Sequence, residues 1–259
     1  CVMRKYPKII FWFVVSSLIL LLAMTWFTGC QSDRLLSQWL LKASQTPGVA
    51  TSWFDQEKNL FTRQAELHLM IAEPAQLLVL SPALNGDNQL RRWLQQSGPI
   101  ELYIELQQHL FPGFTQGSAH INMRQGVFAE RPDMPDIPHR FYWQVNGVTG
   151  DIVAGIEMAQ WNWLRDELTW LVAPFNAEVT LAADKQIDLS VLWQGMQWRN
   201  EQTEARGQLG KLLVNSQLTE NDGLWLMPQA NLLLEQLDLR QPDRQLQLTQ
   251  WHWQTGVSE

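Results

Sequence analysis

The amino-acid sequence predicts a mainly β protein: an antiparallel, extended or curved sheet with an N-terminal transmembrane helix, few short helices and α+β character at the edges. Three observations support this fold class. A run of nineteen residues without charge, 9–27, stands near the start of the 259-residue chain. Most of the remaining sequence alternates apolar and polar residues, as half-buried strands do. Turn signals recur between the alternating segments.

The uncharged run is long enough to anchor the chain in a membrane. As a helix, its nineteen residues would cover about 28 Å, close to the hydrocarbon thickness of a bilayer. Arg4, Lys5 and Lys8 precede the run, and the first charge after it is Asp33. Because basic residues favour the cytoplasmic side, we expect residues 1–8 in the cytoplasm and the body of the chain in the periplasm.

The end of the run leaves a second interpretation open. Thr28-Gly29-Cys30 puts small residues directly before a cysteine, which resembles a lipoprotein signal. Lipidation at Cys30 would remove residues 9–27, whereas a retained helix would keep them as a single-pass anchor. Residues 9–27 are therefore expected to be a transmembrane helix or a signal. The two outcomes are an inner-membrane protein and a lipoprotein.

The charge of the body limits the kinds of partner it can bind, and the positions of the cysteines limit its disulfides. The net charge is −7, and leaving out the three basic residues before the run gives −10 for the remainder. An acidic body disfavours nucleic acid, because phosphate binding needs a basic face. The two cysteines, Cys1 and Cys30, lie outside the body, so we expect no disulfide within it.

The first half of the body is predicted to be a helix followed by hairpins. Residues 28–46 form the expected juxtamembrane helix, since Leu36 and Leu40 recur at helical spacing. Residues 47–130 form a first β-rich subdomain. We expect its hairpin turns at 56–59 and at Pro112-Gly113, and a short helix at 89–96. The expected strands are 49–55, 60–71, 75–80, 100–107 and 118–123.

The second half is predicted to be a second β-rich subdomain, residues 140–259. The stretch 131–139 holds three prolines, which cannot pair in a central strand, so we place the boundary there. The stretch 161–171 is compatible with either a helix or a strand. The expected strands are 141–145, 151–158, 177–181, 187–192, 208–218, 231–239 and 245–253.

No pattern of catalytic, cofactor-binding or metal-binding residues emerges. The histidines His68, His120 and His252 fall among polar strand neighbours, where a solvated or hydrogen-bonded side chain is the simpler interpretation. The acidic pairs lack any surrounding sign of a cleft that would separate their pKa values. We therefore expect no enzyme, no cofactor and no metal.

Tryptophan supplies the one indication of a binding surface. The chain has 14 tryptophans, and each offers a large apolar ring with a single N–H donor. A spacing of two residues puts the rings of one strand on one side. Such a face could hold acyl chains or a partner, or it could simply be the core of a sandwich. The candidate residues are Trp161, Trp163, Trp193, Trp198, Trp251 and Trp253.

Several short segments resemble the YdgA-like family of bacterial envelope proteins. They are WFTG at 26–29, TSWF at 51–54, FTRQA at 61–65, GQLGK at 207–211 and the stretch 245–259. The resemblance implies an inner-membrane protein of a Gram-negative envelope with a large periplasmic β-rich body. It supplies no catalytic residues.

Two functions follow as expectations. The first is a binding or structural module of the envelope that associates with the inner membrane and with itself. The alternative is an AsmA-like lipid-handling protein with an apolar β groove. They differ in whether the tryptophan-bearing face is covered by the protein's own helices.

Overall fold

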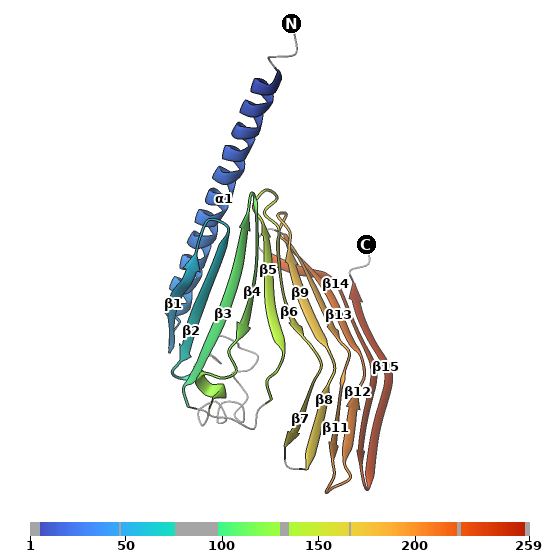
Figure 1. Ribbon diagram of the computed structural model, residues 1–259. Helices are drawn as coiled ribbons and strands as arrows, with labels where there is room; N and C mark the ends of the chain where they lie inside the picture. Colours follow the sequence, from blue (N-terminus) through green and yellow to red (C-terminus); the bar gives the residue numbers. More distant parts are fainter. Residues whose placement is uncertain are drawn as a thin grey trace. The chain divides into compact units, whose positions relative to one another are not determined.

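The computed structural model describes residues 6–46, 48–75, 98–129, 135–165, 167–221 and 224–256. The prediction of a mainly antiparallel β protein is confirmed, since fifteen strands lie in these ranges (Figure 1). The chain divides into two compact units. Unit 1 comprises Cys1–Glu101, Glu105–Gly117 and Val145–Val148, and unit 2 comprises Leu102–Ile104, Ser118–Gln144 and Thr149–Glu259.

Unit 1 begins with α1 (Tyr6–Ser44), which runs without a break through both the uncharged run and the expected juxtamembrane helix. The helix ends at Ser44, and the chain enters β1 through Gly48, whose φ of 76° favours glycine. None of the helices in the described part of the chain combines the length and the apolar character that a membrane span requires.

In unit 1, strands that are consecutive in the sequence are also neighbours in the sheet. They are β1 (Val49–Lys58), β2 (Thr62–Ile71), most of β3 (Ile100–Phe111) and the first half of β4 (Phe114–Ile121). The side chains of Ala65, Leu67 and Leu110 are buried and form the apolar core of this unit. Figure 1 shows α1 alongside β1 and β2.

The turn predicted at 56–59 is wrong by about three residues, because β1 continues to Lys58. A register shift between Asp55 and Glu57 accommodates Gln56 as an extra residue in the strand. The turn follows at Asn59, whose side-chain oxygen accepts the backbone N–H groups of Phe61 (2.9 Å) and Thr62 (2.7 Å). This is the local bonding that makes asparagine a turn former.

Hydrogen bonds and small residues hold α1 on the sheet of unit 1. The backbone N–H of Gly113 donates to Thr28 Oγ1 (3.2 Å), and Gln108 Nε2 donates to Ser32 Oγ (2.6 Å). At Gly29, a Cβ atom would lie 3.3 Å from Leu110 Cδ1, so glycine permits the close approach. One face of α1 is therefore buried against the β3–β4 hairpin.

Unit 2 holds the remaining strands, which pair in the order β5-β6-β9-β10-β13-β14-β12-β11-β8-β7, with β15 on the other edge of β14. A 3-10 turn, η2 (Gly126–Phe128), precedes β5. The strands are β5 (His139–Asn146), β6 (Ile152–Met158), β7 (Trp161–Arg165), β8 (Leu168–Val172), β9 (Phe175–Leu181), β10 (Gln186–Trp193), β11 (Met196–Asn200), β12 (Arg206–Leu209), β13 (Leu212–Asn221), β14 (Leu224–Gln241) and β15 (Arg244–Gly256).

A line of irregular backbone crosses unit 2. Two residues separate β6 from β7, β8 from β9, β10 from β11 and β12 from β13. The breaks are joined across the sheet: the N–H of Ala173 donates to the carbonyl of Gly195 (2.9 Å), and the N–H of Gly210 donates to that of Gln236 (2.7 Å). Pro174 cannot donate a ladder bond, and Gly195 adopts a φ of 107°.

These breaks settle two predictions. The ambiguous stretch 161–171 is strand, forming the hairpin of β7 and β8. The prediction of one strand over 208–218 is wrong, since β12 and β13 are separated at Gly210-Lys211. Most of the strand predicted at 75–80, the helix predicted at 89–96 and residues 131–134 of the proline-rich stretch lie outside the described residues.

Candidate functional site

Unit 2 has an apolar face that six strands share. Residues paired directly in an antiparallel ladder point to the same side of a sheet, and the registers align two rows of apolar residues across β6, β9, β10, β13, β14 and β15. We call these rows the wide apolar face. The first is Ile156, Ala177, Val191, Val214, Leu232 and Trp253, and the second is Met158, Phe175, Trp193, Leu212, Leu234 and Trp251.

The opposite side of the same strands is mixed, with polar rows beside one row that carries Leu192, Leu213 and Leu233. One row crosses it through Glu178, Ser190, Asn215 and Asn231. Beside that row, Asp188 accepts hydrogen bonds from the side-chain amides of Gln186 (3.0 and 3.1 Å) and Gln217 (3.1 Å). The wide apolar face is therefore apolar in both of its rows, whereas the opposite side mixes polar residues with one leucine row, and alternation along each strand keeps the two sides apart.

A second apolar group lies beyond the line of irregular backbone, and we call it the tryptophan block. Its strands are β7, β8, β11, β12, β14 and β15. The rings of Trp170 and Trp198 lie 6.2 Å apart between centroids at an interplanar angle of 39°. One row is Trp163, Trp170, Trp198, Gly207, Leu239 and Leu246, and the other is Trp161, Val172, Met196, Leu209, Leu237 and Leu248.

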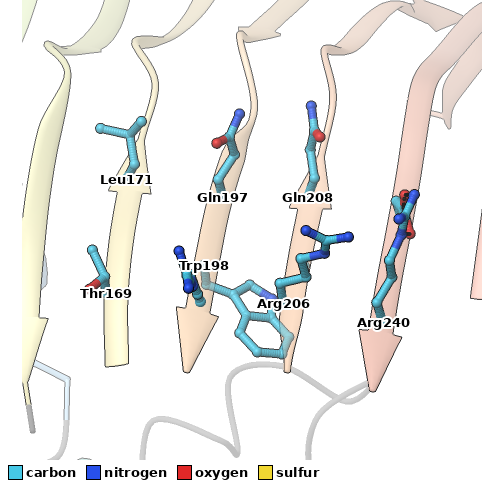
Figure 2. Close-up of a pocket in the computed structure, with 10 residues that line it drawn as sticks. Thr169, Leu171, Gln197, Trp198, Arg206, Gln208 and Arg240 are labelled. Atoms are coloured by element: carbon cyan, nitrogen blue, oxygen red, sulfur yellow. Dashed lines mark hydrogen bonds and ion pairs between the residues drawn. The ribbon is translucent and has the colours of Figure 1, made fainter. Parts of the chain in front are cut away.

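The reverse of the tryptophan block carries an open hollow of about 530 Å³ (Figure 2). Its walls include Gln197, Gln208 and Arg206 from β11 and β12. At one side Arg240 donates to the carboxylate of Asp238 through Nε (3.1 Å) and a terminal nitrogen (2.8 Å). This hydrogen bonding holds the pKa of Asp238 below its ordinary value of 3.8. The hollow thus has mixed walls, in which Leu171 and Trp198 lie beside polar groups, and it has more basic than acidic groups.

Little of the wide apolar face is buried. Among the described residues of unit 2, the buried apolar side chains are those of Ala119, Val172 and Ala230, each small or branched. On β15, Trp251 and Trp253 are each 46% exposed. The described part of unit 2 contains η2 and no α-helix. No helix of this part therefore covers either apolar group.

In each of three tryptophans, the indole N–H is shielded from solvent. None of these N–H groups has a hydrogen-bond partner in the described part of the chain. The three residues are Trp161 and Trp170 of the tryptophan block and Trp193 of the wide apolar face. A buried donor without an acceptor costs about 1–3 kcal/mol, so these N–H groups would gain from an acceptor supplied by a ligand.

Two glycines give aromatic rings room to cross a neighbouring strand. At Gly155 a Cβ atom would fall 2.6 Å from the hydroxyl of Tyr142, which passes over this position and donates to Glu178 Oε2 (2.7 Å). Desolvation, together with that hydrogen bond, raises the pKa of Tyr142 to about 12. The ring of Trp198 crosses Gly207 in the same way.

The structure brings the predicted tryptophans together in two groups rather than one. Trp161, Trp163 and Trp198 belong to the tryptophan block, and the other three candidates belong to the wide apolar face. Sequence reasoning missed Trp170, because the stretch that contains it was ambiguous between helix and strand. Recognising Trp161–Trp163 and Trp170 as two arms of a hairpin would have placed it opposite Trp163.

The other candidate residues lie apart from these surfaces. Cys30 is exposed on α1. His252 Nε2 lies 2.6 Å from Asn231 Oδ1 on the side of β14 and β15 opposite the wide apolar face, which confirms its interpretation as a hydrogen-bonded strand histidine. Within the described ranges, no three His, Cys, Asp or Glu side chains are grouped to hold a metal ion.

The chain matches no protein-family model, no curated protein and no solved structure. The resemblance to the YdgA-like family therefore stays a prediction.

Proposed function

We propose that the chain is a membrane-anchored, lipid-handling protein of a Gram-negative envelope, and that the wide apolar face holds acyl chains. The observation that carries this proposal is the uninterrupted apolar composition of two rows across six strands, with no described helix of unit 2 over them. Apolar patches of more than a few hundred Å² on a protein surface mark sites of interaction. Of the two functions expected from the sequence, this favours the AsmA-like alternative.

The dimensions and energetics of the face suit a long hydrocarbon. Strands spaced about 4.8 Å apart give six strands a span of about 24 Å. Each methylene removed from water contributes about 0.8 kcal/mol. Contact with roughly ten methylenes would therefore contribute about 8 kcal/mol before the costs of binding, enough for a retained ligand.

The shielded indole donors suit the polar part of the same ligand class. Phospholipids carry ester carbonyls beside their acyl chains, and a carbonyl oxygen accepts a hydrogen bond from an indole N–H. Trp193 lies within the wide apolar face at its border with the line of irregular backbone. An ester carbonyl that reached this nitrogen, once the side chains that shield it had moved aside, would satisfy a donor that has no partner among the described residues.

We further propose that residues 9–27 hold the chain in the inner membrane with the body in the periplasm. Support comes from the uncharged sequence and from the large apolar side chains of this part of α1, which include Leu18 (56% exposed), Leu20 (62%) and Trp26 (64%). A lipoprotein cleaved before Cys30 would lose Thr28 and Gly29, which contact the β3–β4 hairpin. The retained helix is therefore the favoured form.

The test is retention of phospholipid by the detergent-solubilised chain, measured by native mass spectrometry. Val214→Glu and Leu232→Glu place a carboxylate in the wide apolar face. An unpaired charge there costs several kcal/mol, so at least a tenfold loss of bound phospholipid is expected. The matched controls Asn215→Glu and Ser190→Glu sit in a polar row on the opposite side of the same sheet and should retain it. Equal retention by all four variants would contradict the proposal.

One observation favours the other expected function, a module that associates with itself. β15 is a thirteen-residue strand whose only described partner is β14, and nearly all its residues are exposed. A long free strand edge can pair with another chain. Light scattering on the solubilised chain would detect a dimer, and Leu248→Pro should return that dimer to a monomer by removing a ladder donor. A chain that is monomeric at all concentrations would exclude this function.

A further inference from the structure

Three consecutive hairpin turns of unit 1 meet beside α1, and each carries an exposed apolar side chain. Phe61 is 51% exposed in the turn between β1 and β2, and Phe111 is 44% exposed at the end of β3. Val148, in the turn after β5, is 76% exposed. Apolar side chains exposed on successive turns are unfavourable in water, so contact with an apolar partner would lower the free energy.

Backbone hydrogen bonds fix these turns against one another. The N–H of Leu110 donates to the carbonyl of Phe61 (2.7 Å), and the N–H of Gly147 donates to the carbonyl of Gly113 (2.8 Å). The rings of Phe111 and Phe114 lie 6.1 Å apart at the β3–β4 turn. The three apolar tips therefore form one patch rather than three separate loops.

The position of the patch along α1 is given by contacts of Gly113 with the helix. Gly113 donates its N–H to Thr28 Oγ1, and a Cβ atom on Gly113 would lie 3.7 Å from Met24 Cε. Met24 to Thr28 is the place where the uncharged run of α1 ends, at Phe27. With a rise of about 1.5 Å per residue, the β3–β4 turn meets the helix within a few ångströms of that end. The β1–β2 turn lies about 9 Å further along the helix, where Lys58 and Arg63 bind Asp33.

The chemistry of this level is that of a bilayer surface. Trp26 (64% exposed) and Phe27 (57% exposed) lie between the buried Thr25 and Thr28 in the sequence of the helix. Tryptophan at the end of a span is typical of the headgroup region. The turn residues of unit 1 at 59–61, 112–113 and 147–148 include no charged residue. An uncharged patch avoids the repulsion that the acidic body would meet at an anionic surface.

We propose that Phe61, Phe111 and Val148 insert into the headgroup region of the same bilayer that holds α1. The patch, together with Trp26 and Phe27, would fix unit 1 on the membrane surface rather than leave it at the end of a free helix. This inference rests on the membrane anchoring proposed above. It is independent of what the wide apolar face binds.

The test places an environment-sensitive fluorophore on single cysteines of the full chain, in a background with Cys1→Ser and Cys30→Ser. The chain is reconstituted in vesicles of phosphatidylethanolamine and phosphatidylglycerol. Val148→Cys and Phe111→Cys report on the patch. The matched controls are Phe54→Cys and Ala50→Cys on β1, which lie about 13 and 26 Å from Lys58 at the turn end of that strand.

We expect the labels at Val148 and Phe111 to emit at shorter wavelength and to be quenched by headgroup-proximal nitroxide lipid. The labels at Phe54 and Ala50 should instead be quenched by aqueous iodide. Vesicle flotation separates the two proposals: a chain that does not float has lost the anchoring itself. A chain that floats while all four labels respond to iodide alone would overturn the inserted patch and leave the anchor intact.

Discussion

The indole ring of Trp198 lies over Gly207 on the neighbouring strand, in the space that a Cβ atom of that residue would fill. A Cβ atom at Gly207 would overlap the ring, so Gly207→Ala should force the indole out of the tryptophan block. Overpacking of this kind typically costs about 1–3 kcal/mol. We expect the urea midpoint of the solubilised chain to fall accordingly.

Gly256→Ala is the matched control, because a Cβ atom there would meet only the Pro228 carbonyl, at an ordinary 3.7 Å. Its midpoint should change little. Trp198→Leu combined with Gly207→Ala should recover part of the loss. If Gly207→Ala alone unfolded like the wild-type chain, the close packing of Trp198 on Gly207 would be refuted.

Arg63 links α1 to the β1–β2 hairpin, and this link should weaken in acid. Its side chain is 10% exposed and lies 2.6 Å from both Asp33 Oδ1 and Asp55 Oδ1. The hydrogen bond from Arg63 holds the pKa of Asp55 below its ordinary value. The carboxylate therefore stabilises the fold above about pH 4, and that contribution is lost as the pH falls through the lower folded pKa.

Asp55→Asn should lower the free energy of unfolding by about 1 kcal/mol at neutral pH, a modest value because Asp55 is 35% exposed. The difference from wild type should shrink below about pH 4. Urea unfolding at several pH values measures it. Asp243→Asn is the control, since Asp243 is 73% exposed and its 3.5 Å pair with Arg244 should contribute nothing measurable. A pH-independent difference would contradict the account.

The phenol of Tyr142 should lose its proton only at high pH. Its pKa is raised to about 12 by desolvation and by the hydrogen bond to Glu178. A raised phenol pKa stabilises the fold fully below about pH 10, and that contribution is lost as the pH rises through 12. Phenolate absorbance should show a late phase that Tyr142→Phe removes and Tyr103→Phe retains. A late phase that survives Tyr142→Phe would show that another group produces it.

Cys30→Ser should leave membrane attachment unchanged. The residues just before Cys30 contact the β3–β4 hairpin, so a retained α1 needs no acyl group. Cells labelled with palmitate and then fractionated give the measurement. We expect no label on the chain and equal membrane fractions for both forms. Label that disappears in Cys30→Ser, with release of the chain from membranes, would establish the lipoprotein instead.

The strands could be predicted from alternation because one side of the sheet is apolar and the other carries polar rows. Strands 187–192 and 231–239 lie within β10 and β14, since Leu189 and Leu237 alternate with polar neighbours. Periodicity in one strand is a local property that sequence reports directly.

Strand order and breaks could not be predicted in this way. β14 pairs with β13 over one half and β12 over the other, an arrangement that depends on the two-residue breaks at Gly210-Lys211 and its neighbours. These breaks look like ordinary strand residues or turns when taken singly. Only the cross-strand bonds, such as that from Gly210 to Gln236, show that they lie in one line. The rows of the wide apolar face depend on the same registers.

The proposed role of the wide apolar face is tested most directly by photo-crosslinking in cells, with benzoylphenylalanine at successive positions of β13. Side chains at 212 and 214 belong to the wide apolar face, whereas those at 213 and 215 point to the other side of the sheet. Mass spectrometry of the purified chain then detects any attached phospholipid. We predict phospholipid adducts at 212 and 214 and none at 213 and 215. Adducts at neither pair, or equally at both, would contradict a lipid-holding face.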